Sequence, residues 1–344
     1  MQAPPVRYVT TPDGYDIAYT ICGEGPSFVC APLGIFNHVQ LNWERAQSVG
    51  PWLGELASRF RLVHFDGRGQ GLSTRGLGGL RSMADYCRDL EAVVEALELD
   101  RFVLYGGAAF THVAVHYAVL HPEKVAALIL VLAARSGAAW PRGMTLVAEE
   151  NWELYLRSRL PTNLNRAEAD RHAASLRQSI TPEDFTTLSR VFSESDVSAL
   201  LPRIEAPALV IHPKHQAWVS EEEAVKLAAA IPGSRLVLDE GGETAAEDAA
   251  AAVRLMDAFL AELPEVGPAG TARASERPVN PDRLSGREIE VLRLVAEGRS
   301  NAEISEALVI STNTVVRHLS NIFAKIDVHN RTEAASYAHR RGLT

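Results

Sequence analysis

The first 263 residues alternate between short apolar runs and longer amphipathic stretches. Runs rich in aliphatic and β-branched residues occur at 27–31, 62–65, 102–105, 127–132, 208–212 and 235–238. Between several of them, as at 83–97 and 221–230, apolar residues recur at the three- and four-residue spacing of a helix. Buried strands joined by crossover helices produce this alternation, so the pattern predicts an α/β fold with a mostly parallel sheet.

Three stretches depart from this alternation. Near the start, two strand-like runs at 8–10 and 17–21 flank Asp13 and Gly14, a pair that favours an antiparallel hairpin. From about 136 to 203 the pattern predicts only helices, which we interpret as a lid inserted between two strands. Residues 264–283 hold four prolines and two glycines, and predict a linker between one domain at 1–263 and another at 284–344.

The last sixty or so residues have the pattern of a small helical domain. Ser285 with Glu288, and Ser300 with Glu303, have the spacing of capping boxes and predict two helix starts. The predicted buried stripes are Ile289, Leu292 and Val295 in the first helix, Ile304, Ala307 and Leu308 in the second, and Val315, Leu319, Ile322, Phe323 and Ile326 in the third. Two short helices joined by a tight turn fit a helix-turn-helix, although a small solvated bundle has the same pattern.

Residues 284–288, 292–298, 301–304, 314–315 and 318–322 resemble the LuxR-type helix-turn-helix domain. The resemblance implies that the third helix enters the major groove of promoter DNA, and that a fourth helix at about 332–341 supports a homodimer. It implies DNA contacts from Thr312, Asn313, Thr314, Val316, Arg317, Ser320, Asn321 and Lys325. Val316 stands where this family usually carries lysine, so we expect Arg317 to take over part of that contact.

Charge and cysteine content set further limits. The chain carries a net charge of -9, but residues 310–344 hold five basic and two acidic side chains, so the basic end lies where DNA would bind. The three cysteines lack CxxC spacing, which predicts neither a disulfide framework nor a metal site, and we expect no cofactor. The longest apolar run, 125–134, is too short to cross a bilayer and the start lacks a signal peptide, so we expect a soluble, cytoplasmic protein without a membrane partner.

The glycine-rich segment at 66–73, which follows a strand, resembles a loop of the α/β-hydrolase fold. Segments 121–125 and 204–211 extend this resemblance to about residues 6–263. Asp66 could also be read as the phosphoacceptor of a receiver domain, but the neighbouring glycines and the lid disfavour that reading. We expect Asp66 and Arg68 to hold a turn.

The resemblance allows each member of a hydrolase catalytic triad to be checked. Ala108 stands at the serine position of the segment 106–110, Gln216 at the acid position, and Glu243 at the histidine position. Leu33 and Gly34 occupy the usual His-Gly pair of the oxyanion hole. We therefore predict that the chain is not an enzyme, and we interpret His112, His116 and His215 as structural residues rather than catalysts.

A pocket under the lid should remain when the triad is lost. We predict ligand contacts from Ile35, Phe36, Ala108, Ala109, Gln216, Trp218 and Glu243, with Trp140 and Trp152 possible from the lid. The leading hypothesis is a transcriptional regulator whose inactive hydrolase-like domain senses a small-molecule effector. One alternative is a bifunctional hydrolase-regulator with an unconventional site. The other is a ligand-independent scaffold for dimerisation or docking, which a pocket filled by its own side chains would favour.

Overall fold

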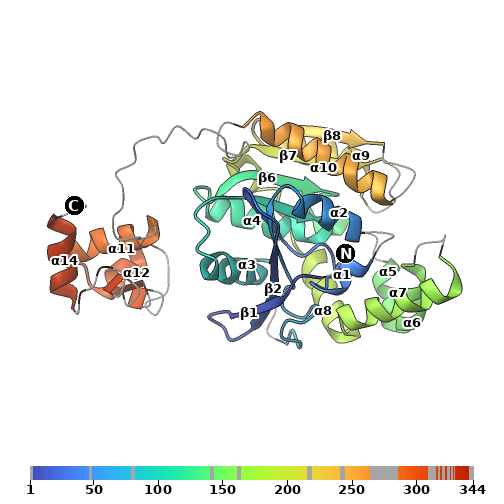
Figure 1. The fold of residues 1–344 in the computed structure, drawn as a ribbon, viewed down its shortest axis with the longest axis horizontal. Coiled ribbons are helices and arrows are strands. Elements are labelled where there is room, and N and C mark those ends of the chain that lie inside the picture. Colours follow the sequence, from blue (N-terminus) through green and yellow to red (C-terminus); the bar gives the residue numbers. More distant parts are fainter. Residues whose placement is uncertain are drawn as a thin grey trace. The chain divides into compact units, whose positions relative to one another are not determined.

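The computed structural model divides into two compact units, Met1–Thr271 and Ala272–Thr344 (Figure 1). It describes residues 3–45, 49–78, 82–139, 143–160, 164–214, 219–240, 245–263, 286–308 and 330–340, together with 315–316, 318–319, 322–323, 326 and 328. The predicted linker at 264–283 lies outside the described residues, and its boundaries stay a prediction.

The first unit is built on one sheet with the strand order β1-β2-β4-β3-β5-β6-β7-β8. The β1–β2 and β2–β4 pairs are antiparallel, and all other neighbouring strands are parallel. The predicted hairpin and mostly parallel sheet are therefore confirmed. The strands are β1 (Val6–Thr10), β2 (Asp16–Cys22), β3 (Ser27–Cys30), β4 (Arg61–Phe65), β5 (Phe102–Gly107), β6 (Val125–Val131), β7 (Ala208–Pro213) and β8 (Arg235–Asp239).

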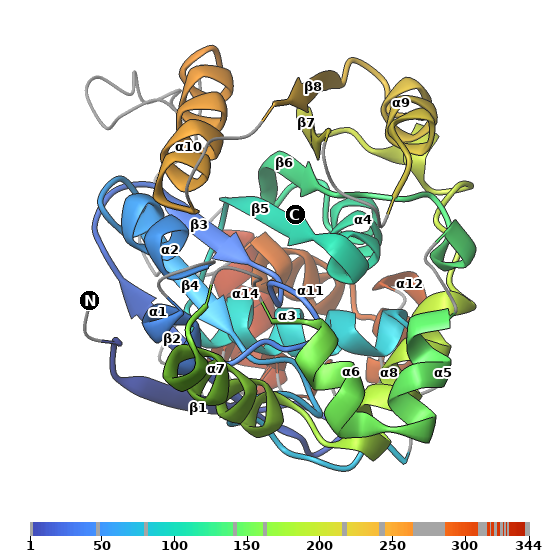
Figure 2. The ribbon, with the colours of Figure 1, turned by 90° about the vertical axis from the view of Figure 1, so that its right-hand side faces the viewer.

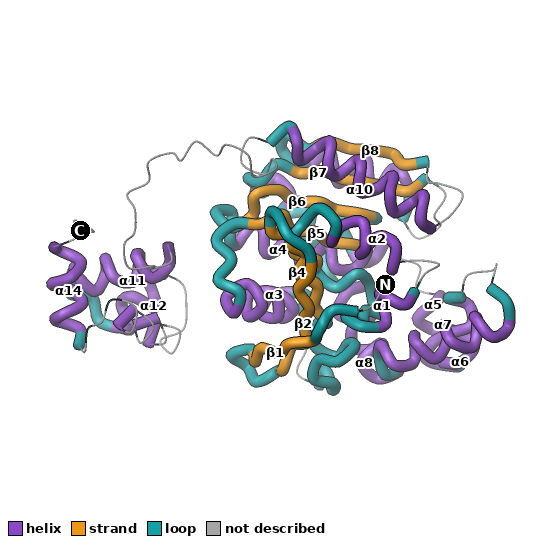
Figure 3. The backbone as a smooth tube through the Cα atoms, in the orientation of Figure 1, coloured by secondary structure: helices purple, strands orange, loops and turns teal. Residues whose placement is uncertain are grey.

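Helices cover both faces of this sheet (Figures 2 and 3). On β5, Val103 and Tyr105 pack in one hydrophobic cluster with residues of α2 (Val49–Ala57) and α10 (Ala245–Ala261). Phe102 and Leu104 belong to the cluster on the other face, with residues of α3 (Ala84–Ala96), α4 (Thr111–Leu120) and α9 (Glu221–Ala230). Successive strand residues point to opposite faces, so a central strand buried on both sides must be apolar at every position.

The segment between β6 and β7 contains the predicted lid and is helical, as expected. It comprises η2 (Gly137–Ala139), α5 (Gly143–Glu150), α6 (Trp152–Ser158), α7 (Arg166–Ser179), α8 (Pro182–Ser193) and η3 (Leu201–Arg203). Side-chain caps start three of these helices: Asn151 accepts from the Leu154 amide, Asn165 forms a capping box with Glu168, and Thr181 precedes a proline at the first turn of α8. Helices α5 to α8 gather beside the body of the unit in Figure 1.

The second unit has its own core. Its described helices are α11 (Gly286–Ala296), α12 (Asn301–Leu308) and α14 (Arg331–Arg340), the last confirming the predicted fourth helix. The Ser300–Glu303 capping box is present: the Ser300 amide donates to Glu303 Oε2 over 2.7 Å, and the Glu303 amide donates to Ser300 Oγ over 3.3 Å. Ser285 lies outside the described residues.

Most of the predicted stripes of this unit are buried. Its core includes Leu292, Val295, Ile304, Val315, Leu319, Ile322 and Ile326, while Ile289, Leu308 and Phe323 are partly buried. Ala307 was predicted in the same stripe but is exposed. It lies about 60° around the helix from Ile304, on the side opposite Leu308, and α12 is too short to bury so wide a face.

The structure also bears on the expectations for the cysteines and for membrane-spanning segments. The three cysteines are free, with Cys30 and Cys87 buried and Cys22 half-buried. In the described parts of the chain, no helix combines the length and the apolar character required to cross a bilayer.

Candidate functional site

The turn after β5 has the shape of a nucleophile elbow. Ala108 follows the strand with φ +50°, in the left-handed region, and starts the short helix η1 (Ala108–Phe110) that leads into α4. Strand β5 approaches α4 so closely that a Cβ on Gly106 would lie 2.7 Å from the Cβ of Ala114. An α/β-hydrolase places its serine on such a turn, but the methyl group of Ala108 cannot act as a nucleophile.

A cavity of about 410 Å³ lies over this elbow. Ile35, Phe36, Ala108 and Ala109 line it, as predicted. The described lining also includes Leu33, Gly34, Asn37, Asn42, Arg45, Val49, Leu132, Gly137, Thr145, Tyr155, Arg159, Phe185, Ser189, Phe192 and Ser193. A volume in this range is typical of small-molecule sites.

Several predicted pocket residues do not appear in this lining. Gln216, Trp218, Glu243 and Trp140 lie outside the described residues. Trp152 is described but is not among the lining residues; its ring packs against those of Phe36 and Phe185, with 6.1 Å and 5.2 Å between the ring centroids. The predicted contribution of Trp152 is therefore corrected: it supports a lining residue.

Sequence reasoning missed the lid side chains that form the aromatic wall. Tyr155 comes from α6, while Phe185 and Phe192 come from α8. The last two are seven residues apart on an amphipathic helix, a spacing that places them on one face. That pattern could have identified the wall, whereas the arginines at 45 and 159 carry no comparable signal in the sequence.

Asp66 fixes the loop that forms another wall of the cavity. Its buried carboxylate accepts hydrogen bonds from Asn37 Nδ2 (2.7 Å), the Val39 amide (3.0 Å) and the Leu72 amide (2.8 Å). Asn37 Oδ1 in turn accepts from the Leu33 amide over 2.9 Å. Burial raises the pKa of Asp66 to about 6, although these hydrogen bonds favour its charged form. The predicted structural role is confirmed, and burial keeps the carboxylate away from phosphoryl donors.

Arg68 joins the glycine-rich loop after β4 to the hairpin and to α3. Its Nε donates to Asp89 Oδ1 over 2.8 Å, and its Nη1 donates to Asp13 Oδ2 over 2.8 Å. The guanidinium also lies 4.1 Å from the ring centroid of Tyr15. Arg68 and Asp89 are buried, so their opposite charges stabilise one another away from water. The expected turn-holding role of Arg68 is confirmed.

His112 has the contacts of a structural residue. Its Nε2 lies 2.9 Å from the carbonyl oxygen of Ala134, which can only accept, so Nε2 carries the hydrogen. Nδ1 then accepts from the Ser195 hydroxyl over 2.8 Å. Both ring nitrogens are occupied, and burial lowers the pKa of His112 to about 4. His116 is half-buried on the same helix, and His215 lies outside the described residues.

His112 should make the stability of the first unit sensitive to acid. Its folded pKa of about 4 lies below the ordinary histidine value of 6.5, so the unfolded state takes up the proton first as pH falls. The stabilisation is complete above pH 6.5 and is lost towards pH 4, by about 3 kcal/mol. We expect His112→Gln to remove this part of the pH dependence in urea titrations followed by tryptophan fluorescence. An unchanged difference between pH 6.5 and 4.5 would contradict it. His339→Gln, at an exposed position of α14 in the second unit, is the control.

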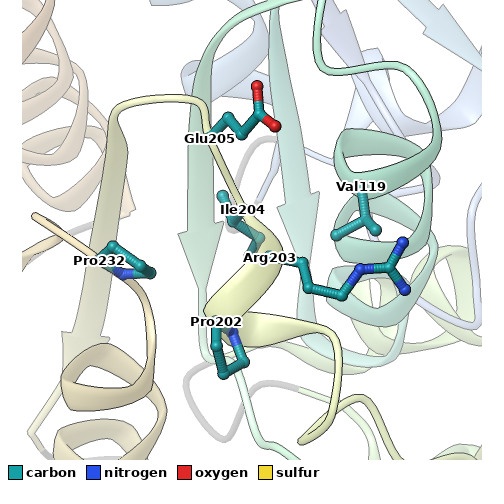
Figure 4. Close-up of a pocket in the computed structure, with 6 residues that line it drawn as sticks. All are labelled: Val119, Pro202, Arg203, Ile204, Glu205 and Pro232. Atoms are coloured by element: carbon teal, nitrogen blue, oxygen red, sulfur yellow. The ribbon is translucent and has the colours of Figure 1, made fainter.

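A second cavity, of about 480 Å³, lies at the opposite end of α4 (Figure 4). Its described lining is Val119, Pro202, Arg203, Ile204, Glu205 and Pro232. These residues lie near the C-terminal end of α4 and just before β7 and β8, at the amino edge of the parallel strands. Ligands of such sheets bind at the carboxyl edge, where Ala108 lies, so the cavity over the elbow is the better candidate despite its smaller volume.

The predicted DNA-contacting residues fall mainly outside the described part of the chain. Val316 is described and is 46% exposed, while its neighbour Val315 is fully buried. Thr312, Asn313, Thr314, Arg317, Ser320, Asn321 and Lys325 are not described. The buried stripe through Val315, Leu319 and Ile322 leaves Val316 on the outer side, as the prediction requires.

Comparison with known proteins assigns both units. Residues 282–338 match the family model of bacterial regulatory proteins of the luxR family, and residues 34–193 match that of the alpha/beta hydrolase fold. The transcriptional regulatory protein LiaR of Bacillus subtilis (strain 168) is 47% identical over 70 residues, which are 20% of this chain. The match spans only 33% of LiaR, so it concerns the C-terminal unit rather than the whole protein.

Solved structures resemble the first unit. A hydrolase from Pseudomonas aeruginosa PA01 aligns with a TM-score of 0.58 and 23% identity, covering 69% of this chain and 91% of that structure. The enol-lactonase from Burkholderia xenovorans LB400 aligns with a TM-score of 0.60 and 21% identity, covering 74% of this chain and 100% of the enzyme. At these identities the likeness concerns the fold. The chain thus joins an N-terminal α/β-hydrolase domain to a C-terminal DNA-binding helix-turn-helix domain of the luxR family of bacterial regulatory proteins.

Proposed function

We propose that this chain is a transcriptional regulator whose hydrolase-like unit is catalytically inactive and senses a small molecule. The observation that carries the proposal is an open cavity of about 410 Å³ over an elbow whose nucleophile position holds Ala108. The sequence adds Gln216 and Glu243 at the other two triad positions. A fold that keeps its pocket and lacks its nucleophile retains binding without covalent chemistry.

The proposed mechanism is a difference in ligand affinity between two states of the regulator. A ligand in the cavity contacts the lid through Tyr155 and Phe185 and the body through Phe36 and Ala109. It therefore stabilises the arrangement in which these parts lie together. In a homodimer on promoter DNA, a change in this arrangement alters the spacing of the two recognition helices and hence the affinity for paired half-sites. Gln216, Trp218 and Glu243 remain proposed ligand contacts.

The experiment that tests sensing uses the full chain. An operator is first selected from random DNA, and a metabolite library is then screened for compounds that raise the melting temperature of the first unit. Each binder is added to operator titrations and to sedimentation measurements. We expect at least one binder to change operator affinity or dimerisation by a measurable factor. Tight binders that change neither property would contradict the sensing proposal.

The open cavity also bears on the two alternative functions. A scaffold needs no cavity, and in this structure the described side chains leave the space over Ala108 unfilled, which favours sensing. A bifunctional enzyme would hydrolyse ester, lactone or epoxide substrates. We expect no turnover from wild type, and none from Ala108→Ser, because a serine lacking a general base stays a weak nucleophile. Turnover by wild type would support the bifunctional alternative.

The DNA-binding assignment predicts a large effect at Arg317. If Arg317 contacts a base, Arg317→Ala should weaken operator binding by about 1–3 kcal/mol, as measured by fluorescence anisotropy. Arg293→Ala, on the exposed side of α11, is the matched control and should bind nearly as wild type. A loss that is equal on all DNA sequences would assign Arg317 to a phosphate. No loss on any sequence would remove it from the interface.

A further inference from the structure

The described lining of the cavity over Ala108 carries positive charge. Arg45 contributes from the body and Arg159 from the lid, and none of the described lining residues is an aspartate or a glutamate. The remaining described lining is apolar, aromatic, or polar and neutral. Charges in a cleft with low-dielectric walls interact more strongly than charges on a flat surface, so two guanidinium groups here matter for what binds.

Arg45 is held in place by oxygens that carry no formal charge. Its Nε donates to Ser175 Oγ over 2.9 Å, and its Nη1 donates to the Phe36 carbonyl over 2.7 Å and to Asn42 Oδ1 over 2.6 Å. Its Nη2 donates to Ser179 Oγ over 2.7 Å. These acceptors are neutral, and the negative charge that acts on Arg45 comes from the buried Asp66, which favours the protonated guanidinium.

Neighbouring groups respond to this charge. Burial, together with the positive charges of Arg45 and Arg75, lowers the pKa of His38 to about 4. The pKa of His172 is lowered by burial and again by Arg45. Burial lowers the pKa of Arg45 itself to about 10, so the side chain stays protonated at neutral pH. The positive charge of Arg45 therefore acts on His38 in the body and on His172 in α7.

Arg159 provides the second cation at the C-terminal end of α6. It caps that helix and lines the cavity together with Tyr155, one turn earlier on the same helix. Burial lowers the pKa of Arg159, as expected for a guanidinium withdrawn from bulk water. Arginine is the side chain best suited to hold a carboxylate, since its planar fork matches the two oxygens.

We infer that the cavity takes a small amphipathic organic anion, with its carboxylate at Arg159 in the field of Arg45 and its apolar body against Phe185 and Phe192. This inference rests on the proposed sensing function and names the class of its ligand. It separates the unit from esterases and lactonases, whose reacting group is a neutral ester. A carboxylate is attracted by the two guanidinium charges of the lining, whereas a neutral molecule of the same shape is not.

A matched pair of fluorescent probes tests this inference on the full chain. 1-Anilinonaphthalene-8-sulfonate and N-phenyl-1-naphthylamine share one aromatic skeleton, and only the first carries a negative charge. We expect the anionic probe to bind at least about ten-fold more tightly, which is the effect of one charged hydrogen bond. Raising the salt concentration should weaken its binding and leave the neutral probe unweakened. Ser189→Phe, which fills the cavity from α8, should abolish binding of both and so locate the site.

Variants at the C-terminal end of α6 show whether Arg159 is responsible for the preference for the anionic probe over the neutral one. Arg159→Gln should weaken the anionic probe by about ten-fold or more and leave the neutral probe unchanged. Arg159→Lys should retain most of the preference, and Arg157→Gln, at an exposed position of the same helix, should behave as wild type. Circular dichroism checks that each variant is folded, and the salt dependence of wild type tests the inference without any variant.

The outcomes separate this inference from the proposed function. Equal affinity for both probes, with loss of both in Ser189→Phe, would overturn the anion preference and leave sensing intact. Tighter binding of a cationic aromatic probe, such as 1-naphthylmethylammonium, would also overturn it. Binding of neither probe in the cavity would contradict both the anion class and an accessible ligand site.

Discussion

The Asp89→Ala variant is expected to lose about 3–5 kcal/mol of the free energy of unfolding of the first unit. Asp89 is fully buried, and it accepts hydrogen bonds from Arg68 Nε over 2.8 Å and from the Arg68 amide over 2.9 Å. Removing this carboxylate leaves a buried guanidinium with much less compensation. All five tryptophans lie before residue 219, so tryptophan fluorescence in urea follows this unit alone.

Asp13→Ala is the matched control for that measurement. Asp13 bonds the same guanidinium at 2.8 Å, but its side chain is 31% exposed. Water can replace part of the lost interaction, so we expect a cost of about 1 kcal/mol. Equal losses in the two variants would show that burial of the Arg68 charge is not what stabilises this region.

Gly71→Ala is expected to destabilise the first unit by about 3–5 kcal/mol, through backbone strain and the loss of buried hydrogen bonds. Gly71 has φ +48°, and a Cβ there would lie 1.9 Å from Asp66 Oδ2. The Asp66 carboxylate cannot move aside without giving up its bonds to Asn37, Val39 and Leu72. The loop that forms a wall of the ligand cavity would lose its support as well.

Gly76→Ala separates the two causes of that loss. Gly76 also has a positive φ, +91°, but nothing lies within 4 Å of the Cβ that an alanine would add. Strain alone should cost about 1 kcal/mol in this control, as measured by the shift of the urea midpoint. If Gly71→Ala cost no more than Gly76→Ala, contact with Asp66 would play no part.

Much of the fold could be predicted from the sequence, because strand burial leaves a local trace. On β5 and β6 nearly every residue is apolar, and this continuous pattern marks strands covered on both faces. The boundaries differed by only a few residues, as where β5 continues through Gly106 and Gly107. In the second unit, the capping pair Ser300 and Glu303 determined a helix start that the structure reproduces.

The ligand cavity could be predicted only in part, because its walls come from distant segments. Ile35, Phe36, Ala108 and Ala109 adjoin recognisable loops, and the family pattern located them. Arg45 and Arg159 reach the cavity through tertiary packing, since they lie at the ends of separate helices, 114 positions apart in the sequence. An isolated arginine in a sequence resembles any solvated surface residue, and only its burial in the fold indicates a role.

The contacts of α7 determine how quickly such a sensor could respond. Three arrangements hold the C-terminal half of this helix on the body: Arg45 donates to Ser175 and Ser179, the Gly71 amide donates to the Ser179 carbonyl over 2.8 Å, and Arg75 Nη2 donates to the Gln178 carbonyl over 2.6 Å. Exchange of a ligand would then proceed by local movement of α5 and α6, on the microsecond to second scale of lid opening. Occupancy would follow the ligand concentration on that scale, and the slower time course of gene expression would be set by later steps.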